Sequence, residues 1–259
     1  MRAMWSGSLT FGLVNIPVKL YSATEEQTPR FDFLHEKDLS PIRYAKFCRG
    51  EGEEVKDEEI VKGFEYKKGE YVVMSDEDFQ RVSPERTRAI EIVSFAAEDE
   101  IDSRYFEKPY YLEPDRGADK AYALLREALR RSGKVGIAKY VLRNRERLAA
   151  IKPEGEALTL NQLRFDAEVR KPEGLKLPPA EQAAEREVEL ALMLVKQLSE
   201  PFRPEQYRDE YSEQLMEIIE QKAEGRVLAP VAEAPEPEKV IDIMAALKAS
   251  LEEVEAKAS

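Results

Sequence analysis

The first 21 residues, MRAMWSGSLTFGLVNIPVKLY, carry an alternation of apolar residues that constrains the fold more than any other stretch. Apolar side chains occupy odd positions from Trp5 to Leu13 and then even positions from Val14 to Leu20. Alternation is typical of half-buried strands, and a switch of parity predicts a bulge or a change of the buried face. The chain is therefore expected to begin with two strands that meet at a bend and enter a buried sheet.

The composition indicates a globular protein rather than a membrane or secreted one. The 259 residues, of which 42% are hydrophobic, are enough for one or two compact units. No apolar run reaches the roughly 18 residues that a membrane span needs, and the N-terminus is not typical of a signal peptide. The single cysteine, Cys48, excludes an internal disulfide. A cytoplasmic location is therefore expected.

The net charge of −12 is unevenly distributed along the chain. Residues 1–177 carry a net charge of −2, whereas residues 178–259 carry −10. Within the first part, residues 116–152 contain 11 basic and 3 acidic residues. Because salt confines the effect of exposed charges to about 10 Å, a local basic stretch can bind phosphates in an acidic protein.

The first half of the chain is expected to consist mostly of strands and loops. Residues 28–70 are polar and charged, which favours an excursion from a sheet over a core segment. Strands are predicted at 71–74, 90–95 and 108–113, with a short helix at 76–82.

The second half changes from strands to helices. The apolar spacing predicts a helix over 118–132 that ends at Gly133. Strands follow at 136–143, 147–152 and 159–164, with a hairpin turn at Asn144 and Arg145. A long helix is expected from Pro178 to about residue 198, and a second from about 207 to 224. A Pro/Ala/Glu linker at 226–239 precedes helical spacing at 240–254, so the fold class is α+β.

Catalytic and cofactor chemistry finds little support in the residue types. One histidine, His35, and one cysteine leave no His-based triad and no multi-His metal site. A Gly-rich phosphate loop of the Walker type is absent from the sequence. No catalytic residue, metal or cofactor is therefore predicted.

Two groups of basic residues are the candidates for chemistry. In the first group, Arg43, Lys46 and Arg49 recur every three residues among aromatic side chains. The same polar stretch also contains Arg30, Lys56, Lys62, Lys67 and Lys68. The second group is Lys139, Arg143, Arg145 and Arg147, and its arginines alternate, so they would point one way from extended strands. Such residues suit phosphate contacts that do not read sequence, although a solvated charged surface would have the same composition.

Several motifs follow one another over nearly the whole chain. They are W-x-G-x-L-x-F-G-L-V-x-I-P-V-K-L-Y at 5–21, I-R-Y-x-x-x-C at 42–48, I-V-K-G-F-E-Y at 60–66, Y-V-V-M-S-D-E-D at 71–78, Y-Y-L-E-P at 110–114, L-R-N-x-x-R-L-A-A at 142–150 and V-I-D-I-M-A-A-L-K-A-S-L at 240–251. Taken in this order, the motifs resemble those of the prokaryotic Ku proteins. The resemblance implies a β-barrel core with a bridge-like insertion and a C-terminal helical arm, assembled as a ring-shaped homodimer. It places the core at 1–177 with the bridge at about 28–70, the dimerisation arm at 178–225, a linker at 226–239 and a docking helix at 240–259.

The resemblance also implies a function. A non-enzymatic homodimer would bind double-stranded DNA ends without reading sequence, protect and bridge breaks, and act at the nucleoid in non-homologous end joining. The terminal helix would recruit the multifunctional ATP-dependent DNA ligase of bacterial end joining through Val240, Ile243, Met244, Leu247 and Leu251.

Two other functions remain open from the residues alone. A lyase could use a lysine amine to form a Schiff base at abasic sites. An acidic adaptor that binds proteins would instead explain the charge of −10 over residues 178–259. Borohydride would trap a lyase covalently on abasic DNA. An adaptor would show no affinity for DNA at moderate salt.

Overall fold

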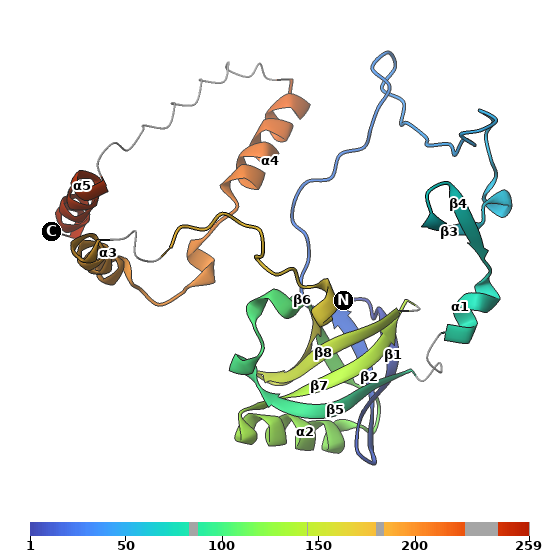
Figure 1. The fold of residues 1–259 in the computed structure, drawn as a ribbon, viewed down its shortest axis with the longest axis horizontal. Helices are drawn as coiled ribbons and strands as arrows, with labels where there is room; N and C mark the ends of the chain where they lie inside the picture. Colours follow the sequence, from blue (N-terminus) through green and yellow to red (C-terminus); the bar gives the residue numbers. More distant parts are fainter. Residues whose placement is uncertain (83–87, 144, 180–183, 226–242, 259) are drawn as a thin grey trace. The chain divides into compact units, whose positions relative to one another are not determined.

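The computed structural model of this chain describes residues 1–82, 88–143, 145–179, 184–225 and 243–258. It divides into two compact units, one made of residues 1–26 and 31–171 and the other of residues 27–30 and 172–259. The first unit contains a β-barrel and a long excursion from it, and the second contains helices (Figure 1).

The opening residues form a β-hairpin. Strands β1 (Trp5–Phe11) and β2 (Val14–Ser22) pair antiparallel, with Leu9 opposite Ile16. Opposed residues share one face of a sheet, so odd positions in β1 and even positions in β2 are buried together. The change of parity therefore comes from the two-residue turn at Gly12 and Leu13, and the predicted bulge or change of buried face is wrong. Leu13 lies in that turn and is fully exposed.

Seven strands close into a barrel in the order β1-β2-β6-β9-β8-β7-β5. The parallel pair β1–β5 closes it, and the other neighbours pair antiparallel. The five later strands are β5 (Ala89–Ala97), β6 (Phe106–Pro114), β7 (Lys134–Leu142), β8 (Arg145–Glu154) and β9 (Ala157–Leu163). The strands predicted at 90–95, 108–113, 136–143, 147–152 and 159–164 are thus confirmed, each within a few residues.

A glycine permits the closure of the barrel between β1 and β5. The backbone N–H of Ser8 donates to the carbonyl of Arg88 at 2.8 Å, just before β5 begins. A Cβ atom at Gly7 would lie 2.1 Å from that same carbonyl oxygen and 2.2 Å from the Trp5 ring. Any larger residue would push the two strands apart, so the third position of the opening motif must be glycine.

Helix α2 (Asp119–Ser132) contributes to the core of the barrel (Figure 1). Its buried residues Tyr122, Leu125 and Leu129 belong to the same apolar cluster as the inward-facing residues of the strands. The helix ends at Gly133, which has the left-handed φ of 63°, as predicted. The apolar face of α2 is thereby removed from water without a second layer of helices.

Tyr122 joins the helix to the sheet through its buried hydroxyl. The hydroxyl donates to the carbonyl of Leu112 at 2.6 Å and accepts from the backbone N–H of Leu158. Leu112 and Leu158 are paired residues of β6 and β9, so the side chain bridges two neighbouring strands. Burial raises the pKa of Tyr122, which keeps the phenol neutral and able to donate.

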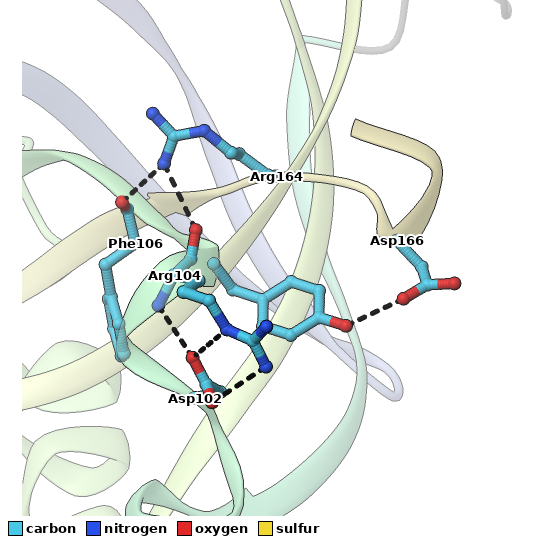
Figure 2. A network of polar contacts seen from close by, with 6 residues as sticks. Asp102, Arg104, Phe106, Arg164 and Asp166 are labelled. Carbon is cyan, nitrogen blue, oxygen red and sulfur yellow. Dashed lines mark hydrogen bonds and ion pairs between the residues drawn. The ribbon is translucent and has the colours of Figure 1, made fainter. Parts of the chain in front are cut away.

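A smaller apolar cluster of Val135, Ala150 and Leu163 has its own polar border. Figure 2 shows the Arg164 guanidinium reaching back to the carbonyls of Phe106, at 2.7 Å, and Arg104, at 3.4 Å. The Tyr105 hydroxyl donates to Asp166 at 2.7 Å. These contacts fix the path of the chain where it leaves the barrel after β9.

The chain between Ser22 and Ala89 contributes no strand to the barrel among its described residues. Strands β3 (Lys62–Lys67) and β4 (Glu70–Met74) form a separate two-stranded sheet, followed by helix α1 (Asp76–Val82). The strand predicted at 71–74 and the helix predicted at 76–82 are confirmed. Almost all side chains of this excursion are exposed, including aromatic ones such as Phe31, Phe33, Tyr44, Phe47, Phe64 and Tyr71.

The second unit contains helices α3 (Glu185–Leu198), α4 (Glu210–Ala223) and α5 (Ile243–Ala258). The prediction that a helix opens at Pro178 is wrong, because residues 178 and 179 are not helical and α3 begins after Ala184. The Glu187 carboxylate accepts from the Ala184 N–H at 3.2 Å, which satisfies a donor that the start of a helix leaves open. Among the described helices, none is both long and apolar enough for a membrane span.

Removing the Tyr122 hydroxyl should destabilise the barrel. Tyr122→Phe keeps the ring but leaves the Leu112 carbonyl and the Leu158 N–H without this partner, so the free energy of unfolding should fall by about 1 to 3 kcal/mol. Urea denaturation followed by circular dichroism measures the change. Tyr21→Phe is the control, since its hydroxyl donates only to the exposed Glu113 carboxylate. Equal midpoints for the two variants would contradict the bridging role.

Candidate nucleic-acid interface

The hairpin of β7 and β8 brings the second basic group together. Leu142 pairs with Arg145, and Arg143 lies in the turn that follows β7, whereas residue 144 lies outside the described residues. Arg143 has a φ of 53°, in the left-handed region, and is exposed. The prediction that three arginines alternate along extended strands is therefore wrong for Arg143, and Arg145 belongs to β8 rather than to the turn.

The paired strands separate the basic residues onto two faces. Arg145 lies opposite Leu142 and Arg147 opposite Tyr140, so both arginines belong to the face that also carries the buried tyrosine. Lys139 lies opposite Leu148 and belongs to the other face. There its ammonium is 3.9 Å from the Glu146 carboxylate. Only part of the group can therefore meet the same phosphates.

A buried polar layer lies beside these arginines inside the barrel. The Tyr140 hydroxyl and the Gln162 amide oxygen are 3.1 Å apart, and the Gln162 amide nitrogen donates to Glu107 at 2.7 Å. Burial raises the pKa values of Tyr110 and Tyr140, so both phenols are neutral at physiological pH. The positive charges of Arg143 and Arg147 act in the opposite direction and lower the pKa of Tyr110.

Two cationic side chains border this layer. The Nε atom of Arg147 is buried and has no hydrogen-bond acceptor among the described residues. Lys108 was not predicted as a site residue, yet its ammonium lies 5.8 Å from the centroid of the Tyr110 ring. Its position beside two tyrosines in a predicted strand was the signal that could have identified it. We refer to Lys108, Arg143, Arg145 and Arg147 as the hairpin cluster.

The excursion places the first basic group on exposed backbone. Lys62 and Lys67 belong to β3, and each forms an ion pair, with Asp76 at 3.2 Å and with Glu70 at 2.9 Å. Lys46 pairs with Asp57 at 2.6 Å. Exposed ion pairs contribute at most about 1 kcal/mol, so phosphates can compete for these lysines. The remaining members of the group in the first unit are also exposed, namely Arg43, Arg49, Lys56 and Lys68.

The other basic residues either belong to the second unit or form ion pairs with acidic side chains. Arg30 belongs to the second unit, whereas the rest of its predicted group belongs to the first. On α2, Arg126 pairs with Glu156, and Arg130 and Arg131 share Glu127. The high basic content of residues 116–152 therefore overstates the positive charge that the surface offers. Among the described residues, no group of three or more His, Cys, Asp or Glu side chains could hold a metal ion.

Comparison with known proteins gives a consistent result over the whole chain. The model of the Ku70/Ku80 beta-barrel domain matches residues 10–190. A protein of Opitutus terrae named non-homologous end joining protein Ku is 44% identical over 100% of this chain and 94% of its own length. Proteins of the same name from Archaeoglobus fulgidus and Bacillus subtilis are 44% and 39% identical, over 98% and 97% of this chain and over 100% and 82% of their own lengths.

The match to the domain begins within β1, includes the other six strands of the barrel and includes every member of both basic groups. The barrel expected from the motif resemblance is confirmed by the strand order, and the identities extend through the helical third. This chain therefore belongs to the Ku family of non-homologous end joining proteins.

Proposed function

We propose that this protein binds the ends of double-stranded DNA as a ring-shaped homodimer, without reading sequence, in non-homologous end joining. The single observation that carries the proposal is a family barrel from which a long, exposed and charged excursion departs without a core of its own. The dimer would protect and bridge breaks and recruit the multifunctional ATP-dependent ligase, and no catalytic step is assigned to it. A location at the nucleoid follows from that role.

Exposed apolar side chains of the excursion support the homodimer. Phe31, Phe33, Phe47 and Phe64 are each at least 65% exposed in the single chain. Monomeric proteins rarely leave so many large apolar groups in water. A second copy of the chain supplies the same surface by symmetry and could cover them. We propose that residues 28–70 form the bridge on the core of 1–177 and that residues 178–225 form the dimerisation arm.

The backbone carrying the basic residues suits phosphate contacts. Lysines on β3 and on irregular segments can follow a phosphate backbone but do not present a helix to the major groove. Arg145 begins β8 and is exposed, so its guanidinium can donate to a phosphate oxygen. A closed ring holds DNA by topology, so these contacts can be weak and still allow sliding.

The terminal helix is our proposed ligase-docking element, after a linker at 226–239. In α5, Ile243 is 63% exposed, whereas Met244 and Leu247 are half-buried. Val240 and the side chain of Leu251, which belong to the same proposed surface, lie outside the described residues. The apolar stripe has the spacing of a helix that enters a groove on its partner.

Threading predicts a preference for free ends. In competition against labelled linear DNA, a plasmid cut once should displace the label, whereas the same plasmid as a closed relaxed circle should compete poorly. Gel-shift titration, with the mass of the complex measured alongside, gives both the preference and the stoichiometry. Equal competition by the circle would contradict the threading mechanism, and no binding to either would favour the acidic adaptor.

Reversing a charge in the hairpin cluster should weaken DNA binding. Arg145→Glu should lower affinity about tenfold near 0.1 M salt and reduce the slope of log affinity against log salt by about one to two. Arg131→Glu is the matched control, because it makes the same charge change at an exposed arginine already paired with Glu127. Fluorescence anisotropy over a salt series measures both slopes. Identical slopes would remove the hairpin cluster from the interface.

A further inference from the structure

The two amphipathic helices α3 and α5 of the second unit pack against each other. Figure 1 shows α5, in red, beside α3, although the two are separated in sequence by all of α4. The contact joins the proposed docking helix to the proposed dimerisation arm. Neither ligase docking nor dimerisation requires α3 and α5 of one chain to pack together, so the contact needs a separate explanation.

The side of α3 that is shielded has helical spacing. Glu187, Leu190, Ala191 and Leu194 are half-buried, which is the i, i+3, i+4, i+7 pattern of one helix face. By contrast, Leu192, Met193 and Val195 elsewhere on the helix are about 60% exposed. Since α5 is the described element that packs substantially on α3, we attribute the shielded face to that contact.

The shielded side of α5 includes two of the residues proposed for docking, Met244 and Leu247. Met244, Ala246, Leu247 and Ser250 are half-buried, whereas Ile243, Lys248 and Ala249 are exposed. An isolated helix of about this length is marginal in water, so α5 gains helical order from a partner surface. In this structure that surface is α3, and the ligase would need the same apolar face.

We propose that α3 is a latch for α5 of the same chain, so that the ligase-docking face is covered until the partner displaces it. This inference rests on the proposed function, because it assigns α5 to ligase docking. A tethered helix experiences a high local concentration of its binding surface, so even a weak contact is substantially closed. The apparent affinity for the ligase is then the affinity of the open form multiplied by the fraction of chains that are open.

Cross-linking tests the latch in the absence of ligase. In a full-length Cys48→Ser background, cysteines replace Leu190 or Leu194 on α3 together with Met244 or Leu247 on α5, which gives four pairs. A short, reducible bis-thiol cross-linker should join at least one pair within a single chain, so the product migrates as a monomer on a denaturing gel. The four single-cysteine variants are the controls. Absence of a cross-link, or a product joining two chains, would overturn the latch.

Ligase binding tests the consequence. Leu190→Glu with Leu194→Glu should open the latch and raise the affinity for the purified end-joining ligase about three- to tenfold. The cross-linked protein should bind the ligase more weakly than its single-cysteine controls do. Cleaving the cross-linker by reduction should restore the affinity, which shows that the weak binding does not come from misfolding. Unchanged affinity in both experiments would overturn the latch.

The two experiments separate failure of the latch from failure of the proposed function. If the cross-link forms but the ligase binds no variant, then α5 is not the docking element and the proposed recruitment fails while the helix contact stands. If the ligase binds every variant equally and no cross-link forms, recruitment stands and the latch fails. Hydrogen exchange of α5, faster after Leu190→Glu with Leu194→Glu, gives a measure of opening that needs no ligase.

Discussion

The sealing of the barrel by α2 is the interaction on which the rest of the first unit depends. A seven-stranded barrel encloses apolar side chains, and α2 completes that core with Tyr122, Leu125 and Leu129. The Tyr122 hydroxyl also serves a carbonyl and an N–H of paired strands, so the helix is held by hydrogen bonds as well as by apolar contact. Because the core is complete within residues 5–163, the chain can send out long segments that contribute nothing to it. The excursion after β2 and the helices after β9 are such segments.

Segments without a core must obtain stability from another surface. The excursion exposes aromatic side chains, and the helices α3 and α4 expose much of their apolar residue content. For the excursion we have argued that a second copy supplies the cover, and for one face of α3 the structure itself supplies it through α5. The same physical need thus accounts for the proposed dimer and for the latch. Where one partner must leave an apolar face before another can bind it, the first contact has to be weak, since a tight contact would exclude the next partner.

Local sequence patterns predicted most helices and strands, but they did not predict which distant strands and side chains pair. Strict alternation located β1 and β2, yet their parity switch predicted a bulge or a change of the buried face, because alternation does not reveal a two-residue turn. Gly133 ended α2 as expected, but Pro178 did not begin α3, since a carboxylate at Glu187 provided the N-terminal partner instead. The closure of β1 on β5 depends on residues about 80 apart in sequence, and no period in the sequence reports it. The basic stretch at 116–152 misled for the same reason, because the partner of Arg126, Glu156, lies outside it.

The distribution of charge reconciles an acidic chain with a proposed polyanion ligand. At about 0.15 M salt the Debye length is about 8 Å, so a phosphate at the hairpin cluster is affected by charges within that distance and little by the net charge of the whole chain. The net charge of −12 therefore does not oppose binding at a local basic surface, but it does discourage unspecific adhesion elsewhere. The same reasoning applies to the contact between α3 and α5. Residues 178–259 carry −10, but α3 and α5 each carry a net charge of only −1, so their packing meets little mutual repulsion. The strength of the contact is therefore set by the apolar area that the two helices share rather than by the charge of the region.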